Sequence, residues 1–399
     1  MKIVIQKFGG TSLQNSEIRA KAAEHIRAAI EEGYKPVVVV SAIGRAGNPY
    51  ATDTLLQTAT SVCNLISPRE KDLIMSCGEL ISAVVMVQTL KQLNITAVAL
   101  NGMQAGIITD DNFNNANIMK IIPDNLLEII GRGEVPVVTG FQGVSENGEI
   151  TTFGRGGSDT TASILAAALK ADLIEIYSDV EGILTADPQK IKNATHIPNV
   201  SYTEAVEMAN KGANVIHPQA VQIASKFNIP IRMFSTSNKD RVTIVHNLES
   251  LRPVTGITSK SEIIYAQIFP PKDDESNNGL SIFQTLADND ISVDFIDITP
   301  DLISFIIDED MEERFSEVLK QNNYNFKTEK EFSKISVIGS GMTGMPGVMA
   351  KIVKALSSKN IIIYECTDSY TTISCLIKKQ DERKALEALH IEFELGSKK

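Results

Sequence analysis

The stretch TTFGRGGSDTT, residues 151–161, decides the fold of this chain. Gly154, Gly156 and Gly157 flank Arg155, and a Ser-Asp-Thr cluster suited to capping a helix follows at once. Glycines let a backbone approach a ligand closely, and an arginine between them favours bidentate capture of a carboxylate or phosphate. A plain turn has little need of such an arginine. The segment therefore predicts an anion-binding loop at the start of a helix.

A second glycine-rich turn lies near the N-terminus, in KFGGTS, residues 7–12. It follows a strand-like run and precedes a helical pattern, so the amides of Gly9 and Gly10 would approach phosphate oxygens. Lys7 would place a mobile cation on the transferring group. The spacing differs from that of a Walker A loop, which requires Gly-Lys-Ser/Thr. Taken alone, the segment fits a tight strand–helix turn equally well.

Two further polar groups follow predicted elements. Ser178 and Asp179 end a strand-like run, at the edge where open α/β sheets bind ligands. In SCGE, residues 76–79, Glu79 stands beside a glycine that we interpret as the start of a helix. Glu79 there either caps that helix and stabilises its dipole or holds a substrate ammonium group, and both interpretations remain open.

The first two thirds of the chain alternate near-continuous apolar runs, expected of strands buried on both faces, with segments of helical period. This alternation predicts a mostly parallel sheet with helices on both sides. The expected strands are Ile3–Ile5, Val37–Val40, Val135–Val138 and Ile174–Tyr177, and the expected helices include Ile18–Ile30 and Thr160–Leu169.

An internal repeat, with an offset of roughly 70 residues, occupies the last third of the chain. Strand-like Ile263–Phe269 corresponds to Lys334–Gly339, and the helix Ser281–Ala287 corresponds to Lys351–Leu356. Two strands and a helix follow in each copy, at 291–293, 302–307 and 312–321 in the first and at 361–363, 372–377 and 382–390 in the second. The repeat predicts two small α+β modules.

The composition restricts the function classes. A length of 399 residues predicts two or more domains, and a net charge of −11 argues against a surface that binds nucleic acid. The four cysteines are widely spaced, without a Cys-x-x-Cys pair, which fits neither a zinc site nor a disulfide framework. We find no signal peptide and no uninterrupted apolar run that would span a membrane. These features predict a cytoplasmic protein with no membrane partner.

The order of the motifs resembles that of the aspartate kinase family, within the wider amino-acid kinase fold. The matching segments are KFGGTS (7–12), SAIG (41–44), SCGELIS (76–82), GFQGV (140–144), TTFGRGGSDTTA (151–162), IYSDVEGILTADP (176–188) and IHPQAV (216–221). The repeat resembles the paired ACT modules of that family. The resemblance covers nearly the whole chain. Within the family, the chain looks most like the diaminopimelate-sensitive isozyme. It implies an α/β amino-acid kinase domain over residues 1–247 and ferredoxin-like ACT modules over 254–330 and 331–399.

The resemblance also implies roles for residues that match the family's motifs. Lys7 and Asp159 would be catalytic. Aspartate would be held by Ser41, Thr52, Glu79, Arg155, Gly156, Gly157 and Ser158. ATP would be held by Lys7, Phe8, Gly9, Gly10, Ser178, Asp179, Leu184, Asp187, Gln189 and Asn214. An amino-acid effector would be held by Ser292, Val293 and Asp294 in the first module and by Ile362 and Ile363 in the second. Magnesium would arrive as MgATP, with no metal held by the protein itself.

Several positions depart from the family pattern. Gln189 stands where an arginine is common, Asn214 where a lysine is common, and Leu184 where many members have an aromatic residue. Loss of both cations should weaken the binding of ATP phosphates unless Lys190 or Lys211 replaces them. In the first module the loop Asp273–Gly279 has Asn-Asn-Gly in place of Pro-Gly, whereas the second module keeps Met345-Pro346-Gly347.

The implied activity is the conversion of ATP and L-aspartate to ADP and 4-phospho-L-aspartate. This is the first step toward lysine, diaminopimelate, threonine and methionine, with feedback by lysine, threonine or diaminopimelate and assembly into a dimer or larger oligomer. A carboxylate nucleophile is already ionised at neutral pH, so no general base is needed and the five histidines read as structural. One alternative is a kinase of glutamate, acetylglutamate or a nucleotide, which Arg155 and the ACT pair argue against. Another is a catalytically weak amino-acid sensor.

Overall fold

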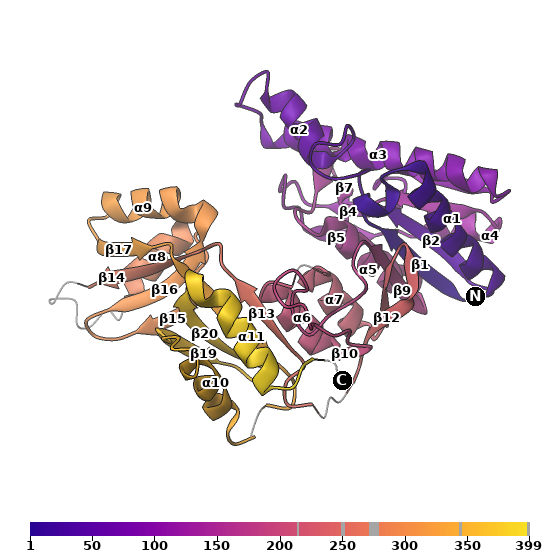
Figure 1. Cartoon of the computed structure of the whole chain (residues 1–399). Coiled ribbons are helices and arrows are strands. Elements are labelled where there is room, and N and C mark those ends of the chain that lie inside the picture. Colours follow the sequence, from indigo (N-terminus) through magenta and orange to yellow (C-terminus); the bar gives the residue numbers. More distant parts are fainter. Residues whose placement is uncertain (214, 249–251, 271–278, 343–344, 397–399) are drawn as a thin grey trace. The chain divides into compact units, whose positions relative to one another are not determined.

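The computed structural model describes residues 1–213, 215–248, 252–270, 279–342 and 345–396 (Figure 1). The chain divides into two compact units. The first contains residues 1–184, 196–210 and 214–250, and the second contains 185–195, 211–213 and 251–399. The second unit therefore includes a short segment, 185–195, that leaves the first unit and returns to it.

An eight-stranded sheet forms the centre of the first unit, in the order β10-β12-β11-β9-β1-β2-β6-β3. The pairings are parallel except for that of β11 with β12. The strands are β1 (Ile3–Phe8), β2 (Lys35–Val40), β3 (Ala97–Leu100), β6 (Val135–Thr139), β9 (Leu173–Ser178), β10 (Asn199–Ser201), β11 (Ile231–Ser235) and β12 (Asn238–His246). The four expected strands are confirmed, each within a longer element.

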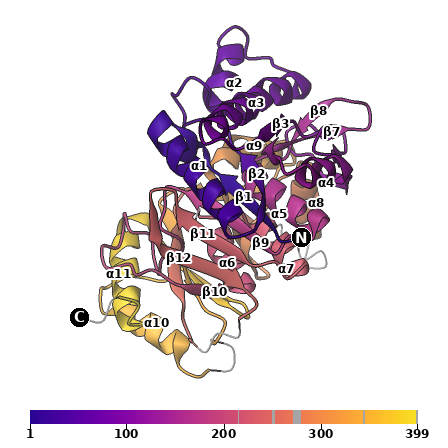
Figure 2. The ribbon, with the colours of Figure 1, turned by 90° about the vertical axis from the view of Figure 1, so that its right-hand side faces the viewer.

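Successive residues of the central strands are buried, so both faces of the sheet must be covered, and helices cover them. Helix α1 packs against β1 and β2 (Figure 2), and α5 packs against β1, β2 and β9. The helices of this unit are α1 (Ser16–Glu31), α2 (Thr52–Thr60), α3 (Pro68–Gln92), α4 (Asp124–Gly131), α5 (Gly157–Leu169), α6 (Tyr202–Asn210) and α7 (Pro218–Lys226). The predicted mostly parallel sheet between helices is confirmed.

A smaller four-stranded sheet, in the order β5-β4-β7-β8, lies in the same unit. Its strands are β4 (Ile107–Thr109), β5 (Ile118–Ile121), β7 (Gln142–Ser145) and β8 (Ile150–Thr152). Strand β8 leads directly into the glycine-rich loop of residues 154–157, and α5 follows that loop. This sheet therefore fixes one end of the loop, and the helix fixes the other.

Helix α3 is long and apolar enough, by length and composition, to cross a membrane. Its Ala83, Met86 and Leu90 instead join a buried cluster with residues of α1 and of the large sheet. The helix also carries two buried carboxylates, Asp72 and Glu79. These contacts are those of a core helix in a globular domain.

The second unit holds two four-stranded sheets, ordered β13-β18-β20-β19 and β15-β16-β14-β17. The strands are β13 (Gly256–Lys260), β14 (Ile263–Phe269), β15 (Asp294–Ile298), β16 (Ile303–Asp308), β17 (Asn325–Glu329), β18 (Phe332–Ile338), β19 (Glu365–Asp368) and β20 (Thr372–Lys378). The helices are α8 (Leu280–Asp288), α9 (Glu312–Gln321), α10 (Val348–Ser357) and α11 (Glu382–Glu392). The ACT-like repeat is confirmed.

Two details of the repeat differ from our expectation. Strand β13 pairs with β18 of the second copy, although its residues were assigned to the first module. The apolar runs 291–293 and 361–363 are not strands, because β15 and β19 begin only at Asp294 and Glu365. Ile291 and Ile361 are 5% exposed and join the core of their copies, whereas the next residues, Ser292 and Ile362, are exposed.

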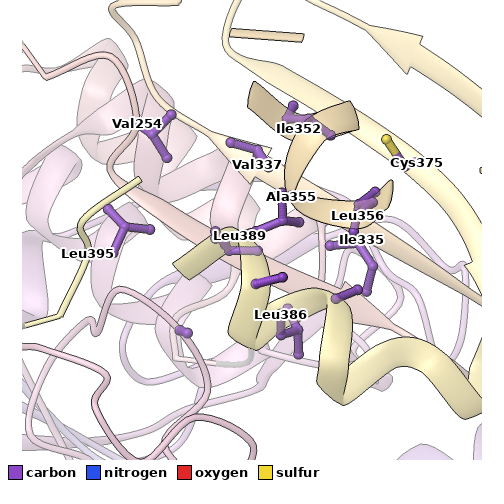
Figure 3. Close-up of a cluster of buried hydrophobic side chains, with 14 of the residues drawn as sticks. Val254, Ile335, Val337, Ile352, Ala355, Leu356, Cys375, Leu386, Leu389 and Leu395 are labelled. Atoms are coloured by element: carbon purple, nitrogen blue, oxygen red, sulfur yellow. The ribbon is translucent and has the colours of Figure 1, made fainter. Parts of the chain in front are cut away.

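Each copy has its own apolar core. The second copy buries side chains of α10, α11 and strands β18 and β20, including Ile335, Ile352, Leu356 and Leu389 (Figure 3). The segment 185–195 contributes Ala186 and Ile191 to that same cluster. Buried apolar contacts therefore hold this segment in the second unit.

Candidate active site

A cavity of about 610 Å³ opens at the carboxyl ends of the central strands of the first unit. The end of β1, the loop after β2, Phe141 after β6, helix α3 and the loop before α5 all contribute to its wall. This is the edge at which open α/β sheets bind ligands. The sequence-predicted residues in the lining are Lys7, Gly10, Ser41, Thr52, Glu79, Arg155, Gly156, Gly157, Ser158 and Asp159.

Lys7 and Asp159 form an ion pair inside this cavity. The Lys7 Nζ lies 2.7 Å from Asp159 Oδ1, and the two side chains are 12% and 11% exposed. Asp159 Oδ2 also accepts a hydrogen bond of 3.2 Å from the backbone N–H of His217. Asp159 stands in the first turn of α5, where the helix dipole stabilises a carboxylate. The carboxylate is thus fixed from two sides and orients Lys7.

The glycines of the loop are required by close packing. Gly154 and Gly156 have φ of 71° and 70°, in the left-handed region that favours glycine. A Cβ on Gly156 would lie 2.2 Å from the His217 ring, and one on Gly157 would lie 2.8 Å from the Phe141 ring. The loop therefore rests directly on these two side chains. This contact assigns His217 a supporting role, in agreement with our structural reading of that histidine.

Glu79 lies in the middle of α3 and not at a helix start, so our placement of that residue was wrong. Gly78 is nevertheless needed, because a Cβ there would lie 2.7 Å from the Cβ of Ala42 in the loop after β2. The glycine lets that loop press against the helix. The contact brings the Ala42 N–H within 3.0 Å of Glu79 Oε1.

The second carboxylate oxygen of Glu79, Oε2, is buried without a hydrogen-bond partner among the described residues. The side chain belongs to a residue that is 2% exposed, and this burial raises the pKa of Glu79 to about 8. The Ala42 hydrogen bond opposes that rise without cancelling it. A buried carboxyl with a vacant acceptor, facing a cavity, is suited to a cationic ligand group.

Three cationic side chains besides Lys7 line the cavity: Arg45, Lys71 and Arg155. Arg45 pairs with Asp179, the predicted nucleotide residue that follows β9. Arg155 is exposed and forms no ion pair within the described part of the chain. Its guanidinium is therefore free to hold an anionic ligand group. Arg45 and Lys71 were not predicted, since neither belongs to a recognisable motif.

Asp72 is a functional support that the sequence did not reveal. Its Oδ2 accepts hydrogen bonds of 2.9 Å from the N–H groups of Asn114 and Thr152, and its Oδ1 accepts one of 2.6 Å from Thr152 Oγ1. These bonds hold the strand that enters the glycine-rich loop. The partners stand 42 and 80 residues away in the sequence, so no local signal could have identified them.

Phe141 occupies a left-handed backbone conformation, with φ of 70°. Its N–H donates to Thr161 Oγ1 at 3.0 Å, and its carbonyl accepts from the N–H of Phe153. Backbone in this region is disfavoured for a large side chain and is retained where surrounding contacts enforce it. The local conformation presses Phe141 against Gly157 at the cavity wall.

The remaining predicted nucleotide residues lie outside this lining. Phe8 and Gly9 end β1, where the Gly9 N–H donates to the Tyr177 carbonyl at 3.1 Å, and Ser178 ends β9. Leu184 belongs to the first unit and Asp187 and Gln189 to the second, while Asn214 lies outside the described residues. Their role at the nucleotide stays a prediction.

Lys190 is occupied elsewhere. Its Nζ lies 2.6 Å from Glu382 Oε1 and 2.9 Å from Ser259 Oγ, all within the second unit. Lys211 lines a cavity of that unit. Lys190 therefore has a structural partner, in contrast to the role of substitute phosphate ligand that we had considered for it.

The predicted effector residues of the first copy lie at a cavity of about 240 Å³ within the second unit. Val293 and Asp294 line it, whereas the exposed Ser292 does not. Asp294 forms an ion pair with Lys334, a side chain that is 1% exposed on β18 of the other copy. Burial opposes ionisation of Asp294, but the hydrogen bond and charge of Lys334 hold the pKa of Asp294 below its ordinary value.

A second cavity, of about 390 Å³, lies in the second copy at the start of α10 and the end of β19, where it is lined by Met349, Asp368 and Tyr370, among others. Ile362 and Ile363 do not line it; Ile362 is 66% exposed and Ile363 packs on the core. Most of the discriminating loop of the first copy, 273–278, lies outside the described residues. Gly279 and Gly347 start the equivalent helices α8 and α10 with φ of 75° and 92°.

Comparison with known protein families agrees with this architecture. The profile of the Amino acid kinase family matches residues 2–235, and that of an ACT domain matches residues 327–391. The structure is similar to the crystal structure of E. coli aspartokinase III in complex with aspartate and ADP, with a TM-score of 0.86. That likeness covers 98% of this chain and 99% of the other at 23% sequence identity, so it shows a shared fold.

Sequence comparison extends the likeness beyond the fold. The chain is 44% identical over 404 residues to aspartokinase 1 of Bacillus subtilis, covering 99% of this chain and all of that protein. It is 36% identical over 412 residues to aspartokinase 2 of the same organism, covering 99% of this chain and 98% of that protein. Full-length identity at this level, together with the cavity described above, places the molecule in a family of enzymes. The chain belongs to the aspartokinase family.

Proposed function

We propose that the chain transfers the γ-phosphoryl group of ATP to the side-chain carboxylate of L-aspartate, yielding ADP and 4-phospho-L-aspartate. One observation carries this proposal. A single cavity unites the vacant carboxylate oxygen of Glu79, the guanidinium of Arg155, which has no ion-pair partner among the described residues, and the Lys7–Asp159 ion pair. Aspartate has one cationic and two anionic groups, and the cavity offers a complement to each.

The charges suggest how aspartate is held. Glu79 Oε2 receives the α-ammonium, and Arg155 binds the α-carboxylate with two parallel hydrogen bonds. The N-terminus of α5 adds the backbone N–H of Ser158 beside that carboxylate, since the Gly157 N–H donates to the Gly154 carbonyl at 3.2 Å. With the α-ammonium and the α-carboxylate both bound, the side-chain carboxylate faces Lys7. Positioning of this kind supplies much of the barrier reduction in phosphoryl transfer.

The chemical step then needs no proton transfer. The carboxylate of aspartate has an unperturbed pKa of about 3.9 and is ionised at neutral pH. Its oxygen attacks the γ-phosphorus as the bond to the leaving ADP oxygen breaks. Lys7 neutralises charge where the two anions meet, and Asp159 keeps the Lys7 ammonium in place. Magnesium enters bound to ATP and belongs to the substrate.

The nucleotide lies, in this proposal, at the turn after β1. A Cβ on Gly10 would lie 2.4 Å from the Gly44 carbonyl oxygen, so only glycine permits that approach of the two loops. Gly10 then presents its backbone N–H to a phosphate oxygen, while the Gly9 N–H donates to the Tyr177 carbonyl and holds the turn in place. Ser178, Asp179, Leu184, Asp187, Gln189 and Asn214 complete the proposed nucleotide-binding set. The E. coli aspartokinase III structure with aspartate and ADP supports use of a nucleotide.

A catalytically weak amino-acid sensor is the second candidate, and one observation favours it. Gln189 and Asn214 lack the charges common at those positions in the family, and Lys190 is held by Glu382. A charged hydrogen bond to phosphate is worth about 1.5–3 kcal/mol, so the missing cations predict weaker ATP binding. Retention of Lys7, Arg155 and Asp159 favours the active enzyme.

The last third, in our proposal, senses an amino-acid end product of the pathway that this reaction begins. Lysine, threonine and diaminopimelate are the candidates, and the E. coli enzyme has been solved with lysine and aspartate bound. Strands β15 and β19 lie at the edges of their sheets, where each could pair with a strand of another chain, and this supports assembly into a dimer or larger oligomer in the cytoplasm. The pathway is that of lysine, threonine and methionine.

The test is a trapping assay on the full chain. MgATP is mixed with aspartate, glutamate or acetylglutamate in hydroxylamine, which converts an acyl phosphate to a hydroxamate. Hydroxamate formed with aspartate supports the proposal. Formation with glutamate alone would assign another acceptor, and no turnover with saturable binding of lysine, threonine or diaminopimelate would favour the sensor.

A further inference from the structure

Two of the four cysteines, far from the proposed active site in the sequence, lie side by side. Cys366 on β19 and Cys375 on β20 are directly paired in the antiparallel register, and their sulfur atoms are 3.8 Å apart. Cys375 is 3% exposed and packs with Ile352 and Leu356 of the second copy's core (Figure 3). Cys366 is exposed. Neither thiol has a role in the phosphoryl transfer proposed above.

The backbone geometry at this pair permits a disulfide. The Ser369 N–H donates to the Thr372 carbonyl, so that pair is hydrogen-bonded, and pair types alternate along an antiparallel ladder. Three steps along the register, Cys366 and Cys375 occupy a non-hydrogen-bonded position. Such positions bring the two Cα atoms to about 4.5 Å, within the range of about 4.4–6.8 Å that disulfides accept.

We propose that Cys366 and Cys375 form a reversible dithiol–disulfide pair that fastens β19 to β20. The Cys375 thiol donates a hydrogen bond to Cys366 Sγ, which favours the thiolate of the exposed partner. That thiolate attacks a small-molecule disulfide such as oxidised glutathione and expels one glutathione thiolate. Cys375, losing its proton, then attacks the Cys366 sulfur of the mixed disulfide and expels the second. One disulfide is reduced to two thiols as the protein dithiol is oxidised.

Closure reaches the neighbouring cavity. In the reduced chain Cys366 Sγ also lies 3.9 Å from Met349 Sδ, and Met349 lines the 390 Å³ cavity of the second copy. Forming the bond draws the two cysteine sulfurs to about 2 Å and so alters the contact with Met349. If the β19 edge pairs with another strand, that pairing uses backbone groups. The Cys366 Sγ contacts Met349 of α10 instead, so strand pairing does not occupy the thiol. The pair therefore links the thiol state to the wall of this cavity.

A peptide map of the full chain tests the proposal directly. Cleavage after Lys359 and Lys378 releases residues 360–378, which contain both thiols, while Cys63 and Cys77 fall in separate peptides, 46–69 and 72–91. The chain is equilibrated with mixtures of oxidised and reduced glutathione, quenched with an alkylating agent and digested. The expected result is a 360–378 peptide that loses two hydrogens and takes up no alkylating agent, restored by a reductant, while Cys63 stays alkylatable.

The exposed Cys366→Ser variant keeps the buried Cys375 and the core intact. In it, Cys375 is expected to remain a free thiol at every glutathione ratio, whereas a Cys63→Ser control should oxidise like the parent chain. The proposal is overturned if 360–378 remains doubly alkylated throughout. It is equally overturned if Cys366 stops at a glutathione adduct without closing onto Cys375. Both outcomes are independent of kinase activity.

Discussion

Replacing Glu79 with glutamine keeps the shape of this side chain but removes its ability to ionise. In the ligand-free chain, burial holds the pKa of Glu79 at about 8, so the carboxyl is mostly protonated at neutral pH. An ammonium group placed on the vacant Oε2 would favour the ionised form. Binding of aspartate must then expel the proton of Glu79.

The size of that release follows from the pKa. With a free value of about 8 and a bound value well below 7, about 0.9 proton leaves per aspartate at pH 7 and about 0.5 at pH 8. The same linkage makes aspartate bind about fivefold more tightly at pH 8 than at pH 7. In Glu79→Gln the proton release disappears. Loss of the charged hydrogen bond weakens aspartate binding by about 1.5–3 kcal/mol, or roughly 10- to 150-fold.

Stability provides an independent readout on the same variant. The folded pKa of Glu79 is raised from 4.5 to about 8, so between these values the folded chain holds a proton that the unfolded chain has released. The contribution of Glu79 is therefore fully present below pH 4.5 and is lost as pH rises through 8. The free energy of unfolding should fall by about 1.4 kcal/mol per pH unit in this window, roughly 5 kcal/mol in all, relative to Glu79→Gln.

Isothermal titration of aspartate in two buffers of different ionisation enthalpy measures the proton count, and urea unfolding at several pH values measures the slope. Asp72→Asn is a useful comparison because it perturbs another buried carboxylate of the same helix. An aspartate affinity that does not vary with pH, without proton release in the parent chain, would refute the placement of the α-ammonium on Glu79.

Three further substitutions probe other parts of the account. Arg155→Ala should lower kcat/KM for aspartate by about 10- to 150-fold, while ATP binding measured by titration stays unchanged. Arg155→Lys should be intermediate, because lysine keeps the charge but not the paired hydrogen bonds. An equal loss of ATP binding would show that Arg155 does not bind aspartate specifically. Gly156→Ala should destabilise the chain by at least about 1–2 kcal/mol, because φ is 70° and the new Cβ meets the His217 ring; unfolding at an unchanged urea midpoint would contradict this. Glu382→Gln should reduce stability by about 1–2 kcal/mol, discounted because Lys190 is about one-third exposed. Burial opposes ionisation of Glu382, but its hydrogen bonds to Lys190, Ser333 and Ser259 lower its pKa. The difference in unfolding free energy between the variant and the parent chain should therefore vanish as pH falls through that lowered value. A difference that stays constant with pH would argue against the ion pair.

Much of the fold could be predicted because its signals are local. Runs such as Val37–Val40 predict strands buried on both faces, and three glycines around Arg155 predict a loop at a helix start. The position of Glu79 was misjudged because a glycine usually marks a helix end. Here Gly78 stands within α3 so that the loop at Ala42 can approach the helix. The sequence does not show which distant loop a helix glycine accommodates.

The missed features depend on partners far apart in the chain. Asp72 supports the glycine-rich loop through Thr152, 80 residues away, and β13 joins the sheet of the second copy by pairing with β18. Neither pairing changes the local pattern of apolar residues. The β-branched residues Ile291 and Val293 predicted a strand, yet β15 begins only at Asp294, and Ile291 is instead buried in the core ahead of it. Tertiary packing, which propensity does not describe, decided each case.

In the proposed reaction the aspartate carboxylate itself attacks the γ-phosphorus, aligned by Glu79, Arg155 and Lys7. This step can be tested with aspartate whose side-chain carboxylate carries ¹⁸O in both oxygens. MgATP and the full chain are supplied in hydroxylamine, which attacks the carbonyl carbon of the acyl phosphate and releases the bridging oxygen with phosphate. Each phosphate released together with hydroxamate is expected to carry one ¹⁸O. Phosphate formed from ATP without ¹⁸O, at the same rate with or without aspartate, would contradict it.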